Sequence, residues 1–207
     1  MPPKLRVLLA VLGVSLLLDQ GSKLWTVHEL AYRGPALDAR ASAGLASLGH
    51  SPANPAELVV LPNALEFVHA QNPAAAMGMM LGFEYRLVVF AVFTLVAVGV
   101  LGWMYRALAP NDRMQAGVIG LLLSGALGNA IDRMHKGTVT DFIKVIVDVE
   151  PLRGWMIGAI GTNEWYTFNI ADAAIFVGVG LYLVTSFMQK DGDTEDAGAS
   201  PLEPADA

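Results

Sequence analysis

The segment LVVFAVFTLVAVGVLGWMY, residues 87–105, has no charged side chain. A helix rises about 1.5 Å per residue and the hydrocarbon core of a bilayer is about 30 Å thick, so this segment predicts a transmembrane helix. Residues 114–131 have no charged side chain either. Two more long apolar segments, residues 5–25 and 168–188, contain a few charges. The sequence therefore predicts an all-α membrane protein with four transmembrane helices.

The overall composition agrees with a membrane protein. Of 207 residues, 54% are hydrophobic and only 15% are charged, and the mean hydropathy is +0.49, which excludes an ordinary water-soluble domain. The formal net charge of -6 equals the charge of residues 191–207, which hold six acids and no base. Residues 1–190 are then neutral and predict no nucleic-acid surface. Cysteine is absent, which excludes disulfides, thiol nucleophiles and cysteine-ligated metals.

Basic residues near the ends of the spans predict the orientation. Lys4, Arg6, Arg106, Arg113 and Lys190 flank the segments that we expect in the cytoplasm, by the positive-inside rule. Both termini are then cytoplasmic, and the loops 26–84 and 132–167 are extracytoplasmic. Lys4 and Arg6 before an apolar run are also typical of a cleaved signal peptide, but no small-residue cleavage site follows promptly.

The remaining segments are polar or irregular. Residues 57–62 and 65–70 have the composition of two short strands joined by a turn at Pro62-Asn63, which predicts a small extracytoplasmic β-sheet beside the membrane. Residues 33–57 form an irregular insertion rich in Ala, Gly, Pro and Ser. We expect one membrane domain over residues 1–190, followed by a disordered acidic tail over residues 191–207.

Polar residues of the spans gather at one predicted face, the outer one. They are Asp19 and Lys23 of the first span, Asn129 and Asp132 of the third, Asn169 and Asp172 of the fourth, with Gln71 and Asn72 before the second. An ionisable group in a span is costly and is functional or paired by default. Asp19 and Lys23, four residues apart, can simply neutralise each other. Asn129 and Asn169 can simply join helices.

Asp172 has no base within one helical turn, and its expected neighbours are Asp132 or Asp141. Two carboxylates in a poorly solvated site share a proton, which is the arrangement of an aspartic protease and needs no cofactor. The four histidines lack zinc-site spacing, so no metal is expected. Small residues at 116, 120, 124 and 128, and at 174 and 178, predict close packing of the third helix against the fourth.

Five segments in order match one family. They are Asp19-Gln-Gly-Ser-Lys23, Asn72 with Ala74-Ala75-Ala76, Gly125-Ala-Leu-Gly-Asn-Ala-Ile-Asp-Arg133, Thr138-Val-Thr-Asp-Phe142 and Phe168-Asn-Ile-Ala-Asp172. Together, in this order and against four spans, they resemble the signature segments of lipoprotein signal peptidase, also called signal peptidase II. The resemblance covers about residues 5–188.

The resemblance implies an aspartyl endopeptidase of the bacterial cytoplasmic membrane with its active site at the outer face. Such enzymes remove the signal peptide from a diacylglyceryl-modified prolipoprotein, cut before the lipidated cysteine and are blocked by globomycin. It implies that Asp141 and Asp172 are catalytic. It further implies a set of substrate-binding or supporting residues: Asn129, Asp132, Arg133, Asn169, the pair Asp19 and Lys23, and the loop residue Asn72. The expected partners are the prolipoprotein and membrane lipid, with no metal or cofactor, and a monomer is expected.

The chain departs from the family pattern in four places. Ala74 and Met77 stand where the family usually has Gly and Phe, and the segments 33–57 and 144–165 are longer than usual. Two other functions compete with proteolysis. A proton or ion translocator would have polar groups near the middle of the membrane, and a structural membrane subunit would not require Asp172 to be unpaired.

Overall fold

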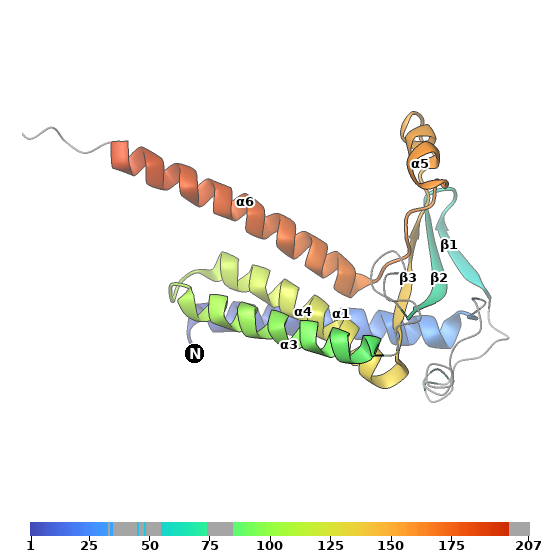
Figure 1. Ribbon diagram of the computed structural model, residues 1–207, viewed down its shortest axis with the longest axis horizontal. Coiled ribbons are helices and arrows are strands. Elements are labelled where there is room, and N and C mark those ends of the chain that lie inside the picture. The colour runs from blue at the N-terminus through green and yellow to red at the C-terminus, as the bar shows by residue number, and fades with distance from the viewer. Residues whose placement is uncertain (33, 35–44, 46–47, 49–54, 74–84, 199–207) are drawn as a thin grey trace, which may run out of the picture.

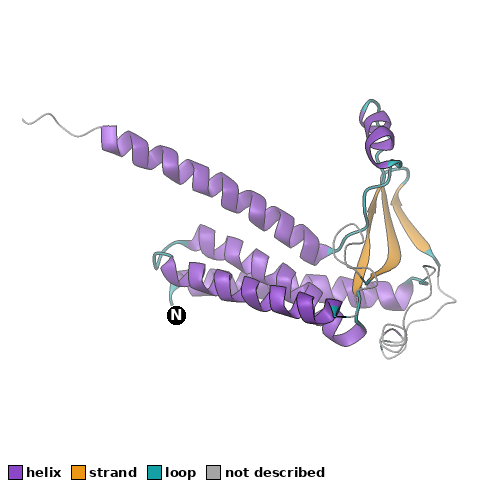
Figure 2. Cartoon of the chain, viewed as in Figure 1, coloured by secondary structure: helices purple, strands orange, loops and turns teal. Residues whose placement is uncertain are grey.

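The computed structural model describes residues 1–32, 34, 45, 48, 55–73 and 85–198. Its helices and strands are α1 (Pro3–Glu29), β1 (Glu57–Leu61), β2 (Leu65–Asn72), α3 (Arg86–Ala107), α4 (Arg113–Lys136), β3 (Val139–Val145), α5 (Leu152–Ile160) and α6 (Ile170–Gly198). The long helices lie on one side, and the sheet stands across their ends with α5 beyond it (Figures 1 and 2).

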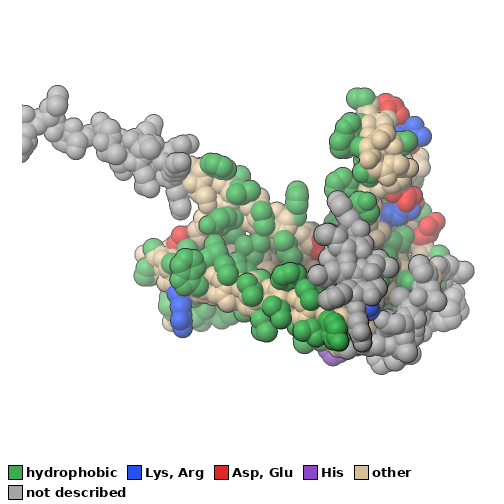
Figure 3. Space-filling view, viewed as in Figure 1, with side chains coloured by type: hydrophobic (Ala, Val, Ile, Leu, Met, Phe, Trp, Pro, Cys, Tyr) green, Lys and Arg blue, Asp and Glu red, His purple; other side chains and the backbone are tan. Residues whose placement is uncertain are grey.

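The four long helices have the length and composition of membrane spans: Pro3–Glu29, Arg86–Ala107, Arg113–Lys136 and Ile170–Phe187. Large apolar side chains on their outer surfaces are exposed, for example Leu17, Phe93, Leu95 and Phe176. Figure 3 shows such side chains along the whole visible length of α3. Only lipid satisfies a surface of this kind, so the prediction of a four-span membrane protein with a small sheet is confirmed.

Helix α4 lies at the centre of the bundle and contacts the other three spans. The small residues at 120 and 124 pack on α1 and not on α6: a Cβ on Gly120 would lie 3.0 Å from the Leu8 carbonyl oxygen, and the Ser124 Oγ lies 2.8 Å from the Ser15 Oγ. Helix α6 meets α4 at Gly178, where a Cβ would lie 2.8 Å from Leu122 Cδ2. The expectation that the residues at 120 and 124 face α6 is wrong: Gly125, one position and about 100° further around the helix, faces α6, where a Cβ would meet the Ala171 carbonyl oxygen and Ile175.

The ends of α4 are well defined. The Asp112 Oδ1 accepts a hydrogen bond from the Gln115 backbone N–H at 3.0 Å and caps the N-terminus. Gly137, with φ 77, ends the helix in the left-handed conformation that favours glycine, and the chain turns into β3. The helix thus extends five residues past the predicted span end at 131, so Asp132 and Arg133 lie in its last turns and not in the loop.

The sheet is antiparallel with the order β1-β2-β3. Both predicted strands are present, and Asn63, with φ 57, lies in the predicted turn between them. The third strand was not predicted. Its residue Asp141 pairs with Ala70, and its first residue, Val139, pairs with Asn72. This pairing brings Asn72 and Asp141 to the end of the sheet beside the helices.

Two regions differ from the sequence-based expectations. Residues 144–165, which remain a predicted insertion, contain the helix α5, which was not predicted. Helix α6 continues to Gly198, so residues 191–198 are helical where a disordered tail was predicted; no proline interrupts the chain before Pro201. Residues 199–207, most of the insertion 33–57, and Ala74 and Met77 lie outside the described residues. The N-terminus and the far end of α6 lie at the same end of the bundle, opposite the sheet (Figure 1).

Candidate active site

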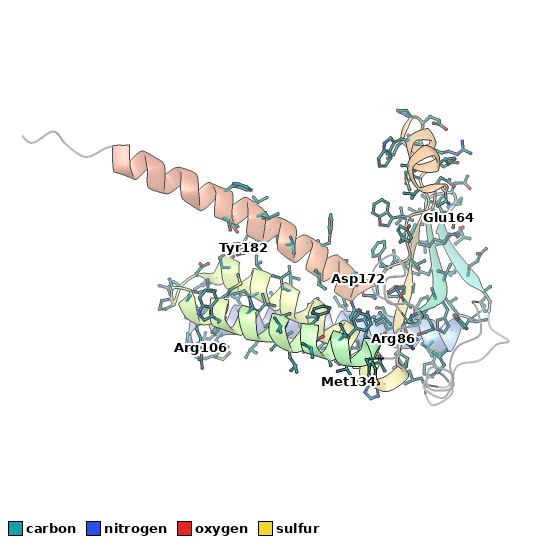
Figure 4. All side chains as sticks on the ribbon, in the orientation of Figure 1. Arg86, Arg106, Met134, Glu164, Asp172 and Tyr182 are labelled. Atoms are coloured by element: carbon teal, nitrogen blue, oxygen red, sulfur yellow. The ribbon has the colours of Figure 1, made fainter. Side chains whose placement is uncertain are left out.

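The predicted polar residues meet where the bundle joins the sheet, around the labelled Asp172 in Figure 4. They come from α1, β2, α4, β3 and the start of α6. Hydrogen bonds and ion pairs join eight of the nine predicted site residues into one network: Asp19, Lys23, Asn72, Asn129, Asp132, Asp141, Asn169 and Asp172. The positive charge of the ninth residue, Arg133, interacts with the charges of three of these acids, Asp132, Asp141 and Asp172.

Asp172 is fixed by the geometry of the helix start. The Asn169 Oδ1 accepts from the Asp172 backbone N–H at 3.0 Å, and the Asp172 Oδ2 accepts from the Asn169 backbone N–H at 3.2 Å. This reciprocal pair has the pattern of a capping box, which satisfies two free N–H groups at the N-terminus of α6. The motif Asn-x-x-Asp therefore positions the carboxylate in the first turn, where the helix dipole stabilises negative charge.

Asp141 lies on β3 and is 3% exposed. Its Oδ2 accepts from Asn72 Nδ2 at 3.0 Å and its Oδ1 accepts from Asn169 Nδ2 at 2.7 Å. Burial raises the pKa of the Asp141 carboxyl to about 7, and the negative charge of Asp172 adds to the rise, whereas the two amides oppose it. Asp141 is thus suited to hold a proton near neutral pH.

Two asparagines connect the two acids. Asn169 contacts both, because its side-chain Nδ2 donates to Asp141 while its backbone N–H donates to Asp172. Asn129 donates from Nδ2 to the Asp172 Oδ1 at 2.8 Å, and its Oδ1 accepts from Asn169 Nδ2 at 3.2 Å. The asparagines thus do more than join helices: they hold the two carboxyl groups in a fixed relation.

Lys23 supports this arrangement from α1. Its Nζ lies 2.9 Å from the Asp19 Oδ2, so the predicted pair exists, but it also donates to the Asn129 Oδ1 at 3.0 Å. This bond turns the Nδ2 of Asn129 toward Asp172. Asp19 in turn accepts from the Ala171 backbone N–H at 2.9 Å, which ties α1 to the first turn of α6. The pair is therefore part of the network around the acids.

Asp132 has a different environment from Asp141. Its Oδ1 lies 3.0 Å from Lys136 Nζ, its Oδ2 lies 3.7 Å from Lys23 Nζ, and the same Oδ2 accepts from the Thr140 backbone N–H at 2.7 Å. Two ammonium groups and an amide thus compensate its charge. The hydrogen bond from Thr140 fixes β3 at the residue that precedes Asp141. Sequence reasoning left both acids as neighbours of Asp172, and these contacts favour a supporting role for Asp132.

A buried polar network joins β2, β3 and the end of α4, and of its residues only Gln71 and Asp132 were singled out from the sequence. Lys136 Nζ donates to the Thr140 Oγ1, which also accepts from Gln71 Nε2 at 3.1 Å. The Gln71 Oε1 accepts from Thr138 Oγ1 at 2.8 Å, and the Gln71 Nε2 lies 2.6 Å from a ring nitrogen of His69. Alternation was the available signal: polar residues at 69 and 71 and at 138 and 140 predict one polar face on two strands.

Arg133 is half-buried at the same end of α4. Its guanidinium lies 4.1 Å from the centre of the Phe90 ring of α3. Its positive charge interacts with Asp172, Asp141 and Asp132. The side chain thus borders the acids on the side of the bundle that α3 occupies.

Four spans with a carboxylate pair at one end have the arrangement of an integral membrane protease of the aspartic type. The family model described as signal peptidase (SPase) II matches residues 11–188. The chain belongs to this family. It is 38% identical to a lipoprotein signal peptidase of Syntrophotalea carbinolica, in an alignment that covers 65% of this chain and 74% of the relative. It is 30% identical to a lipoprotein signal peptidase of Geobacter metallireducens, over 95% of this chain and 99% of the relative.

A similar fold is found among solved structures. A bacterial membrane enzyme determined by the in meso method at 2.3 Å resolution has a TM-score of 0.63 with 22% sequence identity, over 95% of this chain and 94% of the other. A second bacterial membrane enzyme, determined at 1.9 Å resolution, has a TM-score of 0.59 with 23% sequence identity, over 86% of this chain and 90% of the other. These similarities support the four-span fold with its sheet.

Proposed function

We propose that the protein is a lipoprotein signal peptidase that cleaves diacylglyceryl-modified prolipoproteins before the lipidated cysteine. The observation that carries the proposal is the pair Asp141 and Asp172, linked by Asn169 at the end of a four-helix membrane bundle. The family match and the relatives named lipoprotein signal peptidase support the substrate class. The protein resides in the bacterial inner membrane, with both termini cytoplasmic and the acids at the outer face.

In the proposed reaction a water molecule lies between the two acids. Ionised Asp172 takes a proton from this water, whose oxygen attacks the scissile carbonyl carbon, while protonated Asp141 donates its proton to the carbonyl oxygen. The tetrahedral intermediate then collapses: Asp172 gives the proton that it took from water to the leaving nitrogen of the lipidated cysteine, and the C–N bond breaks. Asp141 takes back a proton from a hydroxyl group of the intermediate as the carbonyl forms again. The products are a signal peptide with a free carboxylate and a lipoprotein with a free cysteine amine.

The raised pKa of Asp141 favours this distribution of roles. Asp141 is buried on a strand, so its neutral form is favoured up to a pH of about 7. Asp172 lies in the first turn of α6 with N–H donors on both oxygens, an arrangement that stabilises the anion. Two carboxyls in different environments are the usual basis for one acid and one base at the same pH.

An ion translocator is not favoured. In the described spans the acids, with Lys23 and Lys136, lie at the sheet end of the bundle, and the bases Lys4, Arg6, Arg106 and Arg113 lie at the opposite end. Translocators bind ions near the middle of the membrane. A substrate anchored in one leaflet presents its scissile bond at a membrane face, which is where the acids lie.

The test is cleavage of a purified diacylglyceryl prolipoprotein by the purified protein, with and without globomycin. We expect globomycin-sensitive cleavage before the lipidated cysteine, and loss of cleavage in Asp141→Asn and in Asp172→Asn. Asp112→Asn is the matched control, because it makes the same substitution at the N-cap of α4, at the opposite end of the bundle, and keeps a capping side chain. Cleavage retained in both site variants would refute the assignment.

A further inference from the structure

Helix α5 carries an exposed apolar surface outside the active site. Within residues 149–166, the large side chains of Val149, Leu152, Trp155, Ile157, Ile160, Trp165 and Tyr166 are exposed, and Trp155 is 65% exposed. Monomeric soluble surfaces rarely gather so many large apolar groups on so short a segment. Ile157 and Ile160 lie beside Arg153 around the helix, so we call the other five residues, Val149, Leu152, Trp155, Trp165 and Tyr166, the α5 apolar surface.

On α5 itself, Trp155 and Arg153 lie on opposite sides of the helix, about 160° apart around its axis. Arg153 pairs with Asp148 at 3.4 Å and with Glu150 at 3.1 Å, so these three charged side chains form one group. Figure 3 shows the hydrophobic side chains of α5 on the side turned toward the membrane-spanning helices, and acidic and basic side chains on the opposite side. A segregation of this kind is the pattern of an amphipathic helix lying at a membrane interface.

The fold holds α5 at the level where the spans end. The strands run across the direction of α1, α3 and α4, and α5 lies at the end of the sheet away from the bundle (Figure 1). Backbone hydrogen bonds fix the segment to the sheet: Val147 N–H donates to the Asn163 carbonyl at 2.9 Å, and Trp165 N–H donates to the Val145 carbonyl at 2.8 Å. The two chain segments that flank α5 are therefore tied to each other and to β3.

We infer that the α5 apolar surface docks into the outer leaflet of the membrane beside the bundle. The occupant is lipid at the boundary between headgroups and acyl chains. Tryptophan and tyrosine are enriched at this depth, and the surface contains two tryptophans and one tyrosine. The charged group of Asp148, Glu150 and Arg153 is exposed and faces water. Docking of α5 holds β3, and with it Asp141, at a fixed depth. The inference depends on the four spans and not on the proposed reaction.

The absence of native cysteine allows a direct test. A nitroxide is attached to Trp155→Cys, or to Arg153→Cys as the matched control on the charged side, and each full-length protein is reconstituted into phosphatidylethanolamine/phosphatidylglycerol vesicles. Electron paramagnetic resonance then compares collisions with oxygen, which partitions into lipid, and with a water-soluble nickel chelate. We expect oxygen collisions to dominate at 155 and nickel collisions to dominate at 153.

Two results would overturn the inference. Nickel collisions that dominate at both positions would place α5 in water. Exclusion of both reagents at 155, with spin–spin broadening that increases with the ratio of protein to lipid, would show that a second copy covers the surface. Trp165→Cys provides a second position if Trp155→Cys misfolds, and oxygen collisions are expected to dominate there too.

Discussion

Titration of Asp141 gives a quantitative prediction about the reaction. Its pKa rises from 3.8 to about 7, mainly through burial. A rise of about three pH units, at about 1.4 kcal/mol for each, corresponds to about 4 kcal/mol in favour of the neutral form. The unfolded chain releases this proton near 3.8 and the folded chain near 7, so the free energy of unfolding falls as the pH rises between these values. In the proposed reaction Asp141 acts in its protonated form, so kcat/KM is expected to fall as the pH rises through about 7.

Replacement of Asn72 tests the cause of this pKa. Its Nδ2 donates to the Asp141 Oδ2 at 3.0 Å and stabilises the carboxylate, so Asn72→Ala removes an interaction that lowers the pKa of Asp141. A hydrogen bond to a charged group is worth about 1.5 kcal/mol or more, which corresponds to about one pH unit. The alkaline limb of the kcat/KM profile is therefore expected to move up by about one pH unit.

The assay is cleavage of a lipidated prolipoprotein from about pH 5 to about pH 9, and the alkaline pKa is read independently of the maximal rate. Asn111→Ala, in the exposed turn before α4, is the matched control and should leave the limb in place. A downward shift in Asn72→Ala, or no alkaline limb in the unsubstituted protein, would refute the assignment of the shared proton to Asp141.

Three further predictions concern packing and the buried charges. Lys23→Met leaves Asp19 buried without its ammonium partner, and we expect a loss of about 3 kcal/mol or more in thermal unfolding together with a lower kcat; an unchanged kcat would argue against its action through Asn129. Gly120→Leu places a side chain where a Cβ already lies 3.0 Å from backbone of α1, so the unfolding temperature should fall, whereas Gly99→Leu, with nothing within 4 Å, should be neutral; equal effects would contradict the packing. Lys136→Met removes a buried partner of Asp132, and amide exchange in β3 should accelerate; unchanged exchange would show that the pair does not hold the strand.

The sequence predicted the spans and the first two strands because both depend on local composition. Continuous apolar segments indicate membrane helices whatever their neighbours do. The third strand was not predicted, because alternation covers only residues 138–140 and the rest of β3 depends on pairing with β2. Helix α5 and the helical conformation of residues 191–198 at the end of α6 were not predicted either. The polar composition of residues 191–198 suggested disorder.

The site could be predicted as a set of residues but not as an arrangement. The position of polar residues at one end of each span indicated that they meet, since charges in lipid need partners. Which acid lies beside Asp172 could not be read from local spacing: Lys136 is a local partner of Asp132, but Lys23 of α1 and the Thr140 amide of β3 reach Asp132 only through the fold. A lysine three or four residues from an acid predicts an ion pair, but it does not predict the third partner, such as Asn129 for Lys23.

The central claim is that Asp141 and Asp172 act as one unit. The most direct measurement is the single-turnover rate of Asp141→Asn, Asp172→Asn and the double variant on the same lipidated substrate. If each acid works only with the other, each single variant should lose about 10³-fold or more, and the double variant should be no slower than the slower single one. A double variant whose loss equals the product of the two single losses, or a single variant that keeps most of its rate, would contradict the account.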